Sequence, residues 1–272
     1  MTVSVHHADA RDLLNYVTRG GVRLAFLDPP FNTGKHWQHY EDKRTTTEWL
    51  DLMATVFVSL RSALSIDGSV WVNLDERMHA RCRLLMDDVF GENRYVATIQ
   101  WHKKNKPGPA RGIHTVHNPI LVYGREPQWT RAHGVPPLGA HQAQYRYRDD
   151  DGRMYRLRHD GSRTYLDDLL AKGAMPHTWW DYRDVGDGET ARAESEALFG
   201  MPFATPKPEA LMRRIIHIAT DEGDWVLDPF AGSGTTLAVA NAMRRNAIGL
   251  EIEQATIEKF IRVRLGKGVK KW

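Results

Sequence analysis

The sequence of 272 residues contains a single cysteine, Cys82. One thiol excludes an internal disulfide framework and a zinc site built from several cysteines, and it is typical of a reducing compartment. No stretch approaches the roughly 20 consecutive apolar residues that a membrane helix needs. The first residues also lack the basic and apolar regions of a secretory signal. We therefore expect a soluble cytoplasmic protein with no membrane partner.

Patterns that indicate a metal site are missing as well. The chain has 13 histidines, but none stands in an H-E-x-x-H pattern or in a paired spacing beside a carboxylate. We therefore predict no metal. The apolar share of 42% is too high for a disordered chain, and the length is sufficient for a substantial core.

Basic residues are concentrated in the middle of the chain. The whole chain has a net charge of +3, whereas residues 103–163 hold twelve Lys and Arg against five Asp and Glu. That segment therefore carries +7 and the remainder carries −4. Such a distribution indicates a polyanionic partner, with nucleic acid as the first candidate. The alternative is a solvated loop region whose charges balance in three dimensions.

Short apolar runs alternate with segments of helical periodicity, which is typical of an α/β sheet. The pattern predicts three regions: a first half at 1–124, an irregular inserted region at 125–203 and a second half at 204–272. A turn is expected at Asp67-Gly68. Strands are predicted at 2–6, 22–27, 69–74, 95–101, 120–123, 225–227 and 247–250, and helices at 48–64, 78–89, 208–220 and 235–243.

A glycine-rich turn joins the strand at 225–227 to the following helix. It comprises Asp228, Pro229, Phe230, Ala231, Gly232, Ser233, Gly234 and Thr235. Its glycines allow a ligand to approach the backbone, and the helix start offers free N–H groups. No lysine follows the second glycine, so this is not a P-loop. Glu251 closes the next strand, where a carboxylate can accept hydrogen bonds from both ribose hydroxyls. The pattern predicts a nucleoside ligand without pyrophosphate, such as S-adenosylmethionine; a purely structural turn is the alternative.

A second turn, Asp28-Pro29-Pro30-Phe31, follows the predicted strand at 22–27. Two prolines make it rigid and remove two N–H groups. It therefore presents a carboxylate, a backbone carbonyl and an aromatic face together. Asp28 and the Pro29 carbonyl can accept the two protons of a planar exocyclic amine, and Phe31 can stack on its ring. The alternative is a turn that merely ends a strand, with Asp28 capping a helix.

With these two turns, the sequence resembles the beta group of S-adenosylmethionine-dependent DNA amino-methyltransferases. The Asp-Pro-Pro-Phe turn precedes the Phe-x-Gly-x-Gly turn, as in that group. The segments DPPFNTGK, DDDGRMYRL and TPKPEALMRRII resemble modification subunits of type III restriction systems in particular. The resemblance implies a circularly permuted Rossmann-like methyltransferase fold, in which a doubly wound mixed sheet of seven strands carries an inserted target-recognition region.

The resemblance also assigns roles to individual residues. Asp28, Pro29, Pro30 and Phe31 would be catalytic. Asp9, followed by Ala10, matches the acidic residue that reaches the adenine ring of the cofactor, although it can instead cap the next helix. Lys207 would neutralise the methionine carboxylate, or it is a plain surface lysine. The glycine-rich turn would lie under the methionine moiety, and Glu251 would hold the ribose.

The implied activity is site-specific methylation of adenine N6 in double-stranded DNA. Alternatives are N4 methylation of cytosine, an RNA or protein-amide substrate, and a DNA-binding module without catalysis. A phosphate-facing groove or a solvated loop is expected at Lys103, Lys104, Lys106 and Arg111, and further DNA contacts at Arg146 and Arg148. Trp179-Trp180 either packs the insert on the sheet or wedges into DNA. Relatives suggest a homodimer and a cognate restriction subunit as partners, but the short middle region also suits a stand-alone or phage-type enzyme.

Overall fold

The computed structural model describes the chain over residues 1–31, 36–37, 40–41, 44–104, 113–124, 143–172 and 176–266. Two compact units are present. Met1–Pro127 and Thr178–Trp272 together form the first, and Gln128–His177 form the second. Within the described ranges, no helix combines the length and the apolarity that a membrane crossing requires.

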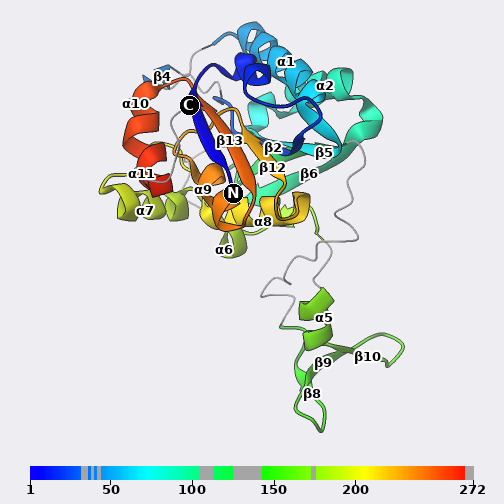
Figure 1. The fold of residues 1–272 in the computed structure, drawn as a ribbon. Coiled ribbons are helices and arrows are strands. Elements are labelled where there is room, and N and C mark those ends of the chain that lie inside the picture. Colours follow the sequence, from blue (N-terminus) through cyan, green and yellow to red (C-terminus); the bar gives the residue numbers. More distant parts are fainter. Residues whose placement is uncertain are drawn as a thin grey trace. The chain divides into compact units, whose positions relative to one another are not determined.

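An eight-stranded sheet forms the centre of the first unit (Figure 1). Among its strands, only β7 runs antiparallel to both neighbours. The spatial order is β1 (Val3–His7), β13 (Asn246–Glu251), β12 (Trp225–Asp228), β2 (Val22–Leu27), β5 (Leu64–Asn73), β7 (His117–Gly124), β6 (Tyr95–His102) and β11 (Trp179–Trp180). The predicted mixed sheet is confirmed, and the two-residue β11 extends it from the expected seven strands to eight.

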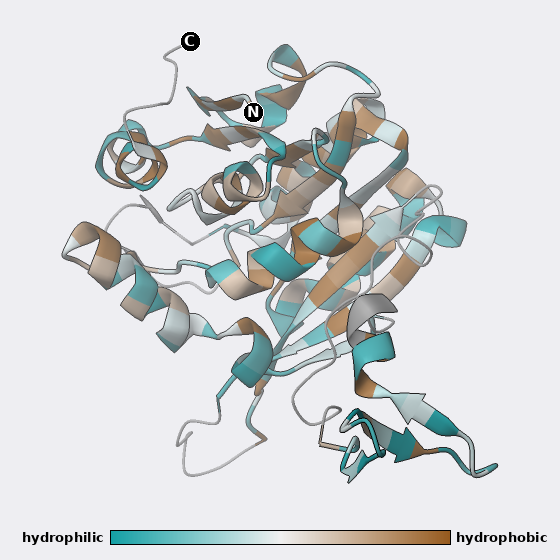
Figure 2. Cartoon of the chain, turned by 60° about the horizontal axis from the view of Figure 1, so that its bottom comes forward, coloured by the Kyte–Doolittle hydropathy of each residue, from teal (hydrophilic) through white to brown (hydrophobic). Residues whose placement is uncertain are grey.

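Helices cover both faces of this sheet, as the doubly wound prediction requires (Figure 1). One face carries η1 (Ala10–Asn15), α1 (Thr46–Ala63) and α2 (Glu76–Phe90), and the other carries α8 (Glu209–Ala219) and α9 (Thr235–Ala242). The sheet strands are strongly apolar, whereas the outward helix faces carry hydrophilic residues (Figure 2).

The two faces are separated by the alternation of strand side chains. Ala25 and Leu27 of β2 belong to the core beneath α1 and α2. Leu24 and Phe26 point the other way and are also buried, on the side where α8 contacts β2. A strand buried on both faces reads as a continuous apolar run, which explains why residues 22–27 were recognisable in the sequence.

Local sequence also fixes where α1 begins. The Thr45 hydroxyl accepts a hydrogen bond from the Glu48 N–H at 3.2 Å, and the Glu48 carboxylate accepts one from the Thr45 N–H at 2.7 Å. This reciprocal capping box starts the helix two residues before the predicted position. The buried stripe on α1 includes Trp49, whose indole contacts the turn at Pro30.

The predicted turn at Asp67-Gly68 is wrong, because β5 runs through it. The pairing of β2 with β5 shifts there: Val22 lies opposite Leu64, whereas Leu24 lies opposite Ser69. The extra residues are therefore absorbed as an irregularity within the ladder. Glycine is required at position 68, since a Cβ there would lie 2.7 Å from the Val22 carbonyl oxygen.

Residues 178–203 belong to the first unit, although the sequence pattern placed them in the inserted region. The β11 strand pairs with β6, and the Trp101 indole donates a hydrogen bond to the Gly186 carbonyl at 2.9 Å. Trp180 is buried and packs near Trp71, whereas Trp179 is half exposed and stacks on His102 with ring centroids 5.1 Å apart. These contacts are non-local, so the irregular sequence pattern did not reveal them.

Shorter elements complete the two units. The first unit also contains β3 (His36–Trp37), β4 (Tyr40–Glu41), η2 (Glu92–Arg94), α6 (Tyr182–Val185), α7 (Gly188–Phe199), α10 (Gln254–Thr256), the π-helical η3 (Ile257–Ile261) and α11 (Arg262–Leu265). The second unit has a three-stranded antiparallel sheet of β8 (Tyr147–Arg148), β9 (Met154–Leu157) and β10 (Arg163–Tyr165), followed by α5 (Leu166–Lys172).

Candidate active site

Polar side chains stand at the carboxyl ends of five neighbouring parallel strands. In spatial order they are Asp9 after β1, Glu251 at the end of β13, Asp228 at the end of β12, Asp28 after β2 and Asn73 at the end of β5. Parallel strands end at the same edge of a sheet, where α/β proteins bind their ligands. The two turns singled out in the sequence therefore lie at adjacent strand ends, because β2 pairs directly with β12.

The Asp28–Phe31 turn is held in place by a contact with α1. The buried Trp49 indole donates a hydrogen bond to the Pro30 carbonyl at 2.7 Å. This bond satisfies one of the two carbonyls that the proline pair exposes. The predicted amine acceptor, the Pro29 carbonyl, is the preceding one. The turn is thus held by a tertiary hydrogen bond as well as by the proline rings.

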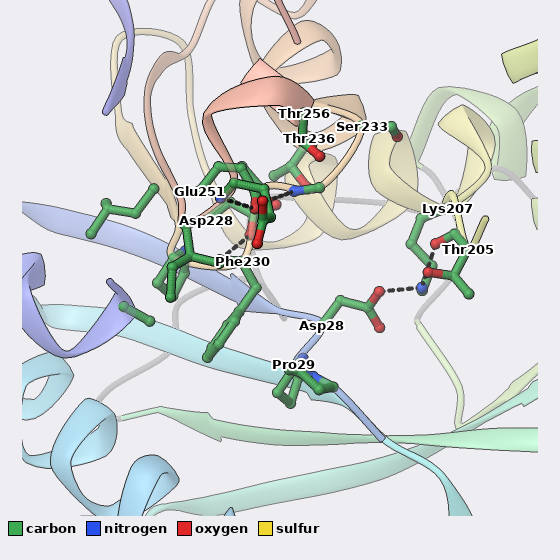
Figure 3. Close-up of a pocket in the computed structure, with 18 of the residues that line it drawn as sticks. Asp28, Pro29, Thr205, Lys207, Asp228, Phe230, Ser233, Thr236, Glu251 and Thr256 are labelled. Atoms are coloured by element: carbon green, nitrogen blue, oxygen red, sulfur yellow. Dashed lines mark hydrogen bonds and ion pairs between the residues drawn. The ribbon is translucent and has the colours of Figure 1, made fainter. Parts of the chain in front are cut away.

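Both carboxylate oxygens of Asp28 have partners. The Asn73 side-chain amide donates to Oδ1 at 2.7 Å, and the Lys207 ammonium forms an ion pair with Oδ2. Lys207 lies in the loop before α8, and its Nζ is 5.7 Å from the centroid of the Phe31 ring. Figure 3 shows the Asp28–Lys207 pair bridging two parts of the pocket wall. The sequence had assigned Lys207 to a cofactor carboxylate, whereas its partner in this structure is Asp28.

The glycine-rich turn has the conformation that its glycines allow. Gly232 and Gly234 have φ values of +50° and +78°, and Gly234 is the N-cap of α9. A Cβ at Gly234 would lie 3.1 Å from Ile261. Glycine is therefore required here both for close packing and for the positive φ. The Phe230 N–H donates to the Asp228 carboxylate at 3.0 Å, which closes the start of the turn.

Glu251 ties the end of β13 to this turn. Its Oε2 accepts a hydrogen bond from the Gly232 N–H at 2.9 Å, and its Oε1 accepts one from the Glu253 N–H at 2.9 Å. Burial nevertheless raises its pKa. Because each carboxylate oxygen has a second lone pair, both oxygens can still accept a hydrogen bond from a ligand hydroxyl.

Asp228 is the most deeply buried acid of the site. Burial raises its pKa to about 7, which outweighs the lowering caused by hydrogen bonds from Thr236 and the Phe230 N–H. The nearby Asp28 and Glu251 carboxylates also raise it. A cation that entered this space would favour the ionised form of Asp228.

Asp9 has the geometry of a helix cap. Its carboxylate accepts a hydrogen bond from the Arg11 N–H at 2.9 Å at the start of η1, and it pairs with the Arg11 guanidinium at 2.7 Å. These contacts lower its pKa, with the Arg11 side-chain hydrogen bond as the largest cause. The capping alternative is therefore present in the structure, and Asp9 also faces the cavity described next.

One cavity of about 540 Å³ joins the two turns (Figure 3). Its volume is typical of a site for a small organic ligand. All predicted catalytic and cofactor residues line it except Gly234, which packs behind the turn. The predicted residues that do so are Asp9, Ala10, Asp28, Pro29, Pro30, Phe31, Lys207, Asp228, Pro229, Phe230, Ala231, Gly232, Ser233, Thr235 and Glu251.

A second cavity of about 960 Å³ adjoins the first at Phe31 and residues 204–207, which line both. Lys103 and Lys104 lie in its wall, where the sequence predicted a phosphate-facing groove. Burial lowers the pKa of Lys103, whereas the Lys104 ammonium pairs with Glu189 at 3.6 Å. The wall thus combines basic groups with acids from α7.

The other predicted DNA contacts lie elsewhere. Lys106 and Arg111 fall outside the described residues. Arg146 and Arg148 belong to the second unit. The Arg146 guanidinium carbon lies 5.3 Å from the centroid of the Tyr147 ring. Arg148 donates a hydrogen bond to the Gly152 carbonyl at 3.0 Å. Neither residue lines the two cavities of the first unit.

Sequence reasoning missed Asn73 and Trp49, the two residues that hold the Asp28 turn. Asn73 was detectable in principle, since it is a polar residue directly after the apolar run Val70–Val72. Its relevance depends on β5 being the neighbour of β2, which the sequence alone does not state. Trp49 is one aromatic residue within the helix predicted at 48–64, and nothing in its local sequence links it to Pro30.

Comparison with known proteins identifies the family of this chain. A family model described as DNA methylase, with N6 and N4 methyltransferases in its name, matches residues 22–262. The DNA adenine methyltransferase YhdJ of Escherichia coli is 28% identical and covers 95% of this chain and 81% of its own. The type III StyLTI Mod subunit of Salmonella typhimurium is 24% identical over 90% of this chain. The chain spans about half the length of that subunit, 51%.

Solved structures share the fold. A putative DNA modification methylase from Thermus thermophilus has a TM-score of 0.58 at 21% identity and covers 100% of this chain and 97% of its own. The PvuII cytosine-N4-specific methyltransferase has a TM-score of 0.66 at 17% identity, with 99% of this chain and 89% of its own covered. Because the family match extends over most of its length, the chain belongs to the DNA methylase family, which uses S-adenosylmethionine as cofactor.

Proposed function

We propose that the chain is a site-specific methyltransferase that methylates the N6 amine of an adenine everted from double-stranded DNA. One observation carries this proposal: the Asp28–Phe31 turn and the glycine-rich turn open into the same cavity. A methyl donor held at one turn and an amine held at the other can meet only under that condition. Family membership supports the same chemistry.

The cofactor end of the cavity lies between Asp228, Glu251 and the glycine-rich turn. S-adenosylmethionine supplies an electrophilic methyl group when it is bound. Glu251 is suited to the ribose, because both of its oxygens retain an acceptor position. In the described part of the chain, no ion pair joins a Lys, Arg or His side chain to the buried Asp228 or to the partly buried Glu251, and a sulfonium charge would compensate these acids. Asp9 and Ala10 would line the adenine end.

The target end lies at Asp28. Its carboxylate and the Pro29 carbonyl would accept hydrogen bonds from the two N–H groups of the amine, which draws the nitrogen lone pair out of conjugation and toward the methyl donor. Phe31 would stack on the base, a contact worth roughly 1–3 kcal/mol. For Asp28 to act, Lys207 has to release Oδ2. We infer that Lys207 exchanges Asp28 for the carboxylate of the cofactor, which frees Oδ2 for the amine.

The second cavity offers an approach for the everted base, since it meets the first at Phe31. Eversion costs a few kcal/mol, and contacts to the DNA backbone can offset that cost. Lys103 and Lys104 in the cavity wall are candidates for such contacts. We propose the same role, contact with the DNA backbone, for two further pairs of basic residues. They are Lys106 and Arg111, which follow in the sequence, and Arg146 and Arg148 in the second unit.

Adenine is proposed over cytosine because one relative, YhdJ of Escherichia coli, is named as a DNA adenine methyltransferase. An N4-cytosine target is the alternative, since the family name covers both amines. A homodimer and a cognate restriction subunit are further proposals. The second is supported by the likeness to a Mod subunit.

Replacing Asp28 by alanine is expected to abolish methyl transfer, because the amine loses its carboxylate acceptor. Cofactor affinity should stay within a few fold or rise, since Asp28 lies at the target end and its removal frees Lys207 for the carboxylate of the cofactor. Transfer of labelled methyl groups to DNA and calorimetric titration with S-adenosylmethionine measure the two effects. Asp12→Ala, at an exposed position, is the matched control. Retained transfer by Asp28→Ala would remove the catalytic assignment.

The modified base can be identified by long-read sequencing of DNA from a host that expresses the protein. N6-methyladenine within one recurring sequence is expected, and it should be missing when the host expresses Asp28→Ala. N4-methylcytosine would contradict the adenine target. Labelling of RNA or protein, with unlabelled DNA, would contradict the DNA substrate itself.

DNA affinity should depend on salt through the lysines of the second cavity. Lys103→Gln and Lys104→Gln are each expected to reduce the slope of log affinity against log salt concentration by about 1, because each removes one phosphate contact. Lys259→Gln, on the exposed side of η3, should leave the slope unchanged. Fluorescence anisotropy with a DNA duplex provides the measurement, and unchanged slopes in the first two variants would favour the solvated-loop alternative.

Cofactor affinity should rise with pH through the titration of Asp228. Because its pKa is raised to about 7, the fraction ionised increases across neutrality, and the ionised form favours a bound cation. We expect S-adenosylmethionine to bind more tightly at about pH 8 than at about pH 6. S-adenosylhomocysteine is the control, since it keeps the amine and carboxylate but lacks the sulfonium charge. Equal pH dependence of both ligands in calorimetric titrations would contradict this expectation.

A further inference from the structure

Asn73 and Asp28 face each other across two paired strands. Leu27 of β2 lies opposite Val72 of β5, and Asp28 and Asn73 are the residues that directly follow this pair. The Asn73 Nδ2 donates a hydrogen bond to Asp28 Oδ1 at 2.7 Å. A carboxylate only accepts hydrogen bonds, so the amide must present its nitrogen here.

The other amide atom of Asn73 identifies what this side chain is for. Its Oδ1 is buried and has no hydrogen-bond partner in the described part of the chain. Asn73 itself is completely buried. An unsatisfied buried acceptor destabilises a fold, and an apolar side chain of similar size would avoid that cost. Packing alone therefore does not explain an asparagine at this position, whereas its donor to Asp28 does.

The two partners of Asp28 differ in how firmly they are held. Asn73 is the last residue of β5, a central strand that pairs with β2 on one side and with β7 on the other, and Asn73 itself lies opposite Ile120 of β7. Lys207 belongs to a loop and reaches Asp28 through a long side chain. Asn73 does not line the cavity, but Asp28 does. The amide thus holds Oδ1 at the sheet, and Oδ2 is the oxygen that remains directed toward Lys207 and the cavity.

We propose that Asn73 is a positioning residue, which fixes the rotation of the Asp28 carboxylate so that Oδ2 can accept a hydrogen bond from the target amine. This inference rests on the proposed function. Without the Asn73 donor, the carboxylate is free to rotate when Lys207 releases it. The amine then meets a disordered acceptor, and the aligned geometry for attack is populated less often.

Asn73→Leu tests the proposal, because it removes the donor and the unsatisfied Oδ1 together while roughly keeping the volume. We expect kcat for methyl transfer to DNA to fall about 10- to 100-fold, as for a misaligned catalytic group. KM for DNA and Kd for S-adenosylmethionine should change less than about threefold. The melting temperature should stay close to that of the wild type, because removal of the unsatisfied Asn73 Oδ1 offsets the donor that Asp28 Oδ1 loses.

Ser69→Ala is the matched control on the same strand. Ser69 is buried and accepts a hydrogen bond from the Trp71 indole at 3.0 Å, away from Asp28. It should show the opposite pattern, with a lower melting temperature and unchanged kcat. If Asn73→Leu does not fold, Asn73→Ser replaces it, because its hydroxyl is too short for the same contact and should lower kcat in the same direction.

The outcomes separate this inference from the proposed function. A wild-type protein that fails to methylate DNA would contradict the proposed function. An active wild type with an equally active Asn73→Leu variant would overturn only the role of Asn73. A fall in kcat accompanied by a matching loss of melting temperature would also overturn it, because the residue would then serve the fold.

Discussion

Parallel pairing between β2 and β12 is the constraint that makes one site from two distant parts of the chain. Ala25 pairs with Leu227, although one lies near the amino terminus and the other near the carboxyl terminus. Since both strands run the same way, the turns that follow them open at one edge of the sheet. A slip of this pairing by a single residue would turn the side chains of β12 to the opposite face. The cavity and the Asp28–Lys207 pair depend on this register.

The same constraint concentrates acids at that edge. Asp28, Asp228 and Glu251 lie at the carboxyl ends of neighbouring strands, and each carboxylate has a different set of partners. Asp28 is paired with a lysine and an amide, Glu251 accepts two backbone N–H groups, and Asp228 is buried with a pKa raised to about 7. An edge of this kind has a surplus of negative charge in a region of low dielectric. It is therefore suited to a ligand that carries positive charge.

The sequence was informative wherever a signal is local. Buried strands read as apolar runs and the two turns stood at their ends, so the edge of the sheet was predictable from residues 22–31 and 225–235. Contacts between elements were less accessible. The link from Trp49 to Pro30, the attachment of residues 178–203 to the sheet and the course of β5 through Asp67-Gly68 all depend on which strands and helices are neighbours. The partner of Lys207 was missed for the same reason, because its local motif says nothing about Asp28.

Asn73 and Lys207 divide the control of Asp28 between a fixed and an exchangeable partner. A carboxylate that must accept a hydrogen bond from the amine of a nucleobase cannot keep both oxygens occupied, yet it must not rotate freely when one is released. An amide on a central strand provides the permanent contact, because the strand that carries it is held by ladders on both sides. A lysine on a loop provides the temporary one, since its ammonium can move to another carboxylate without disturbing the sheet. Interchanging the two would fail: a buried lysine at the strand would lack solvation, and an asparagine on the loop would be too short to reach. The placement of each residue type therefore follows from the motion that its role requires.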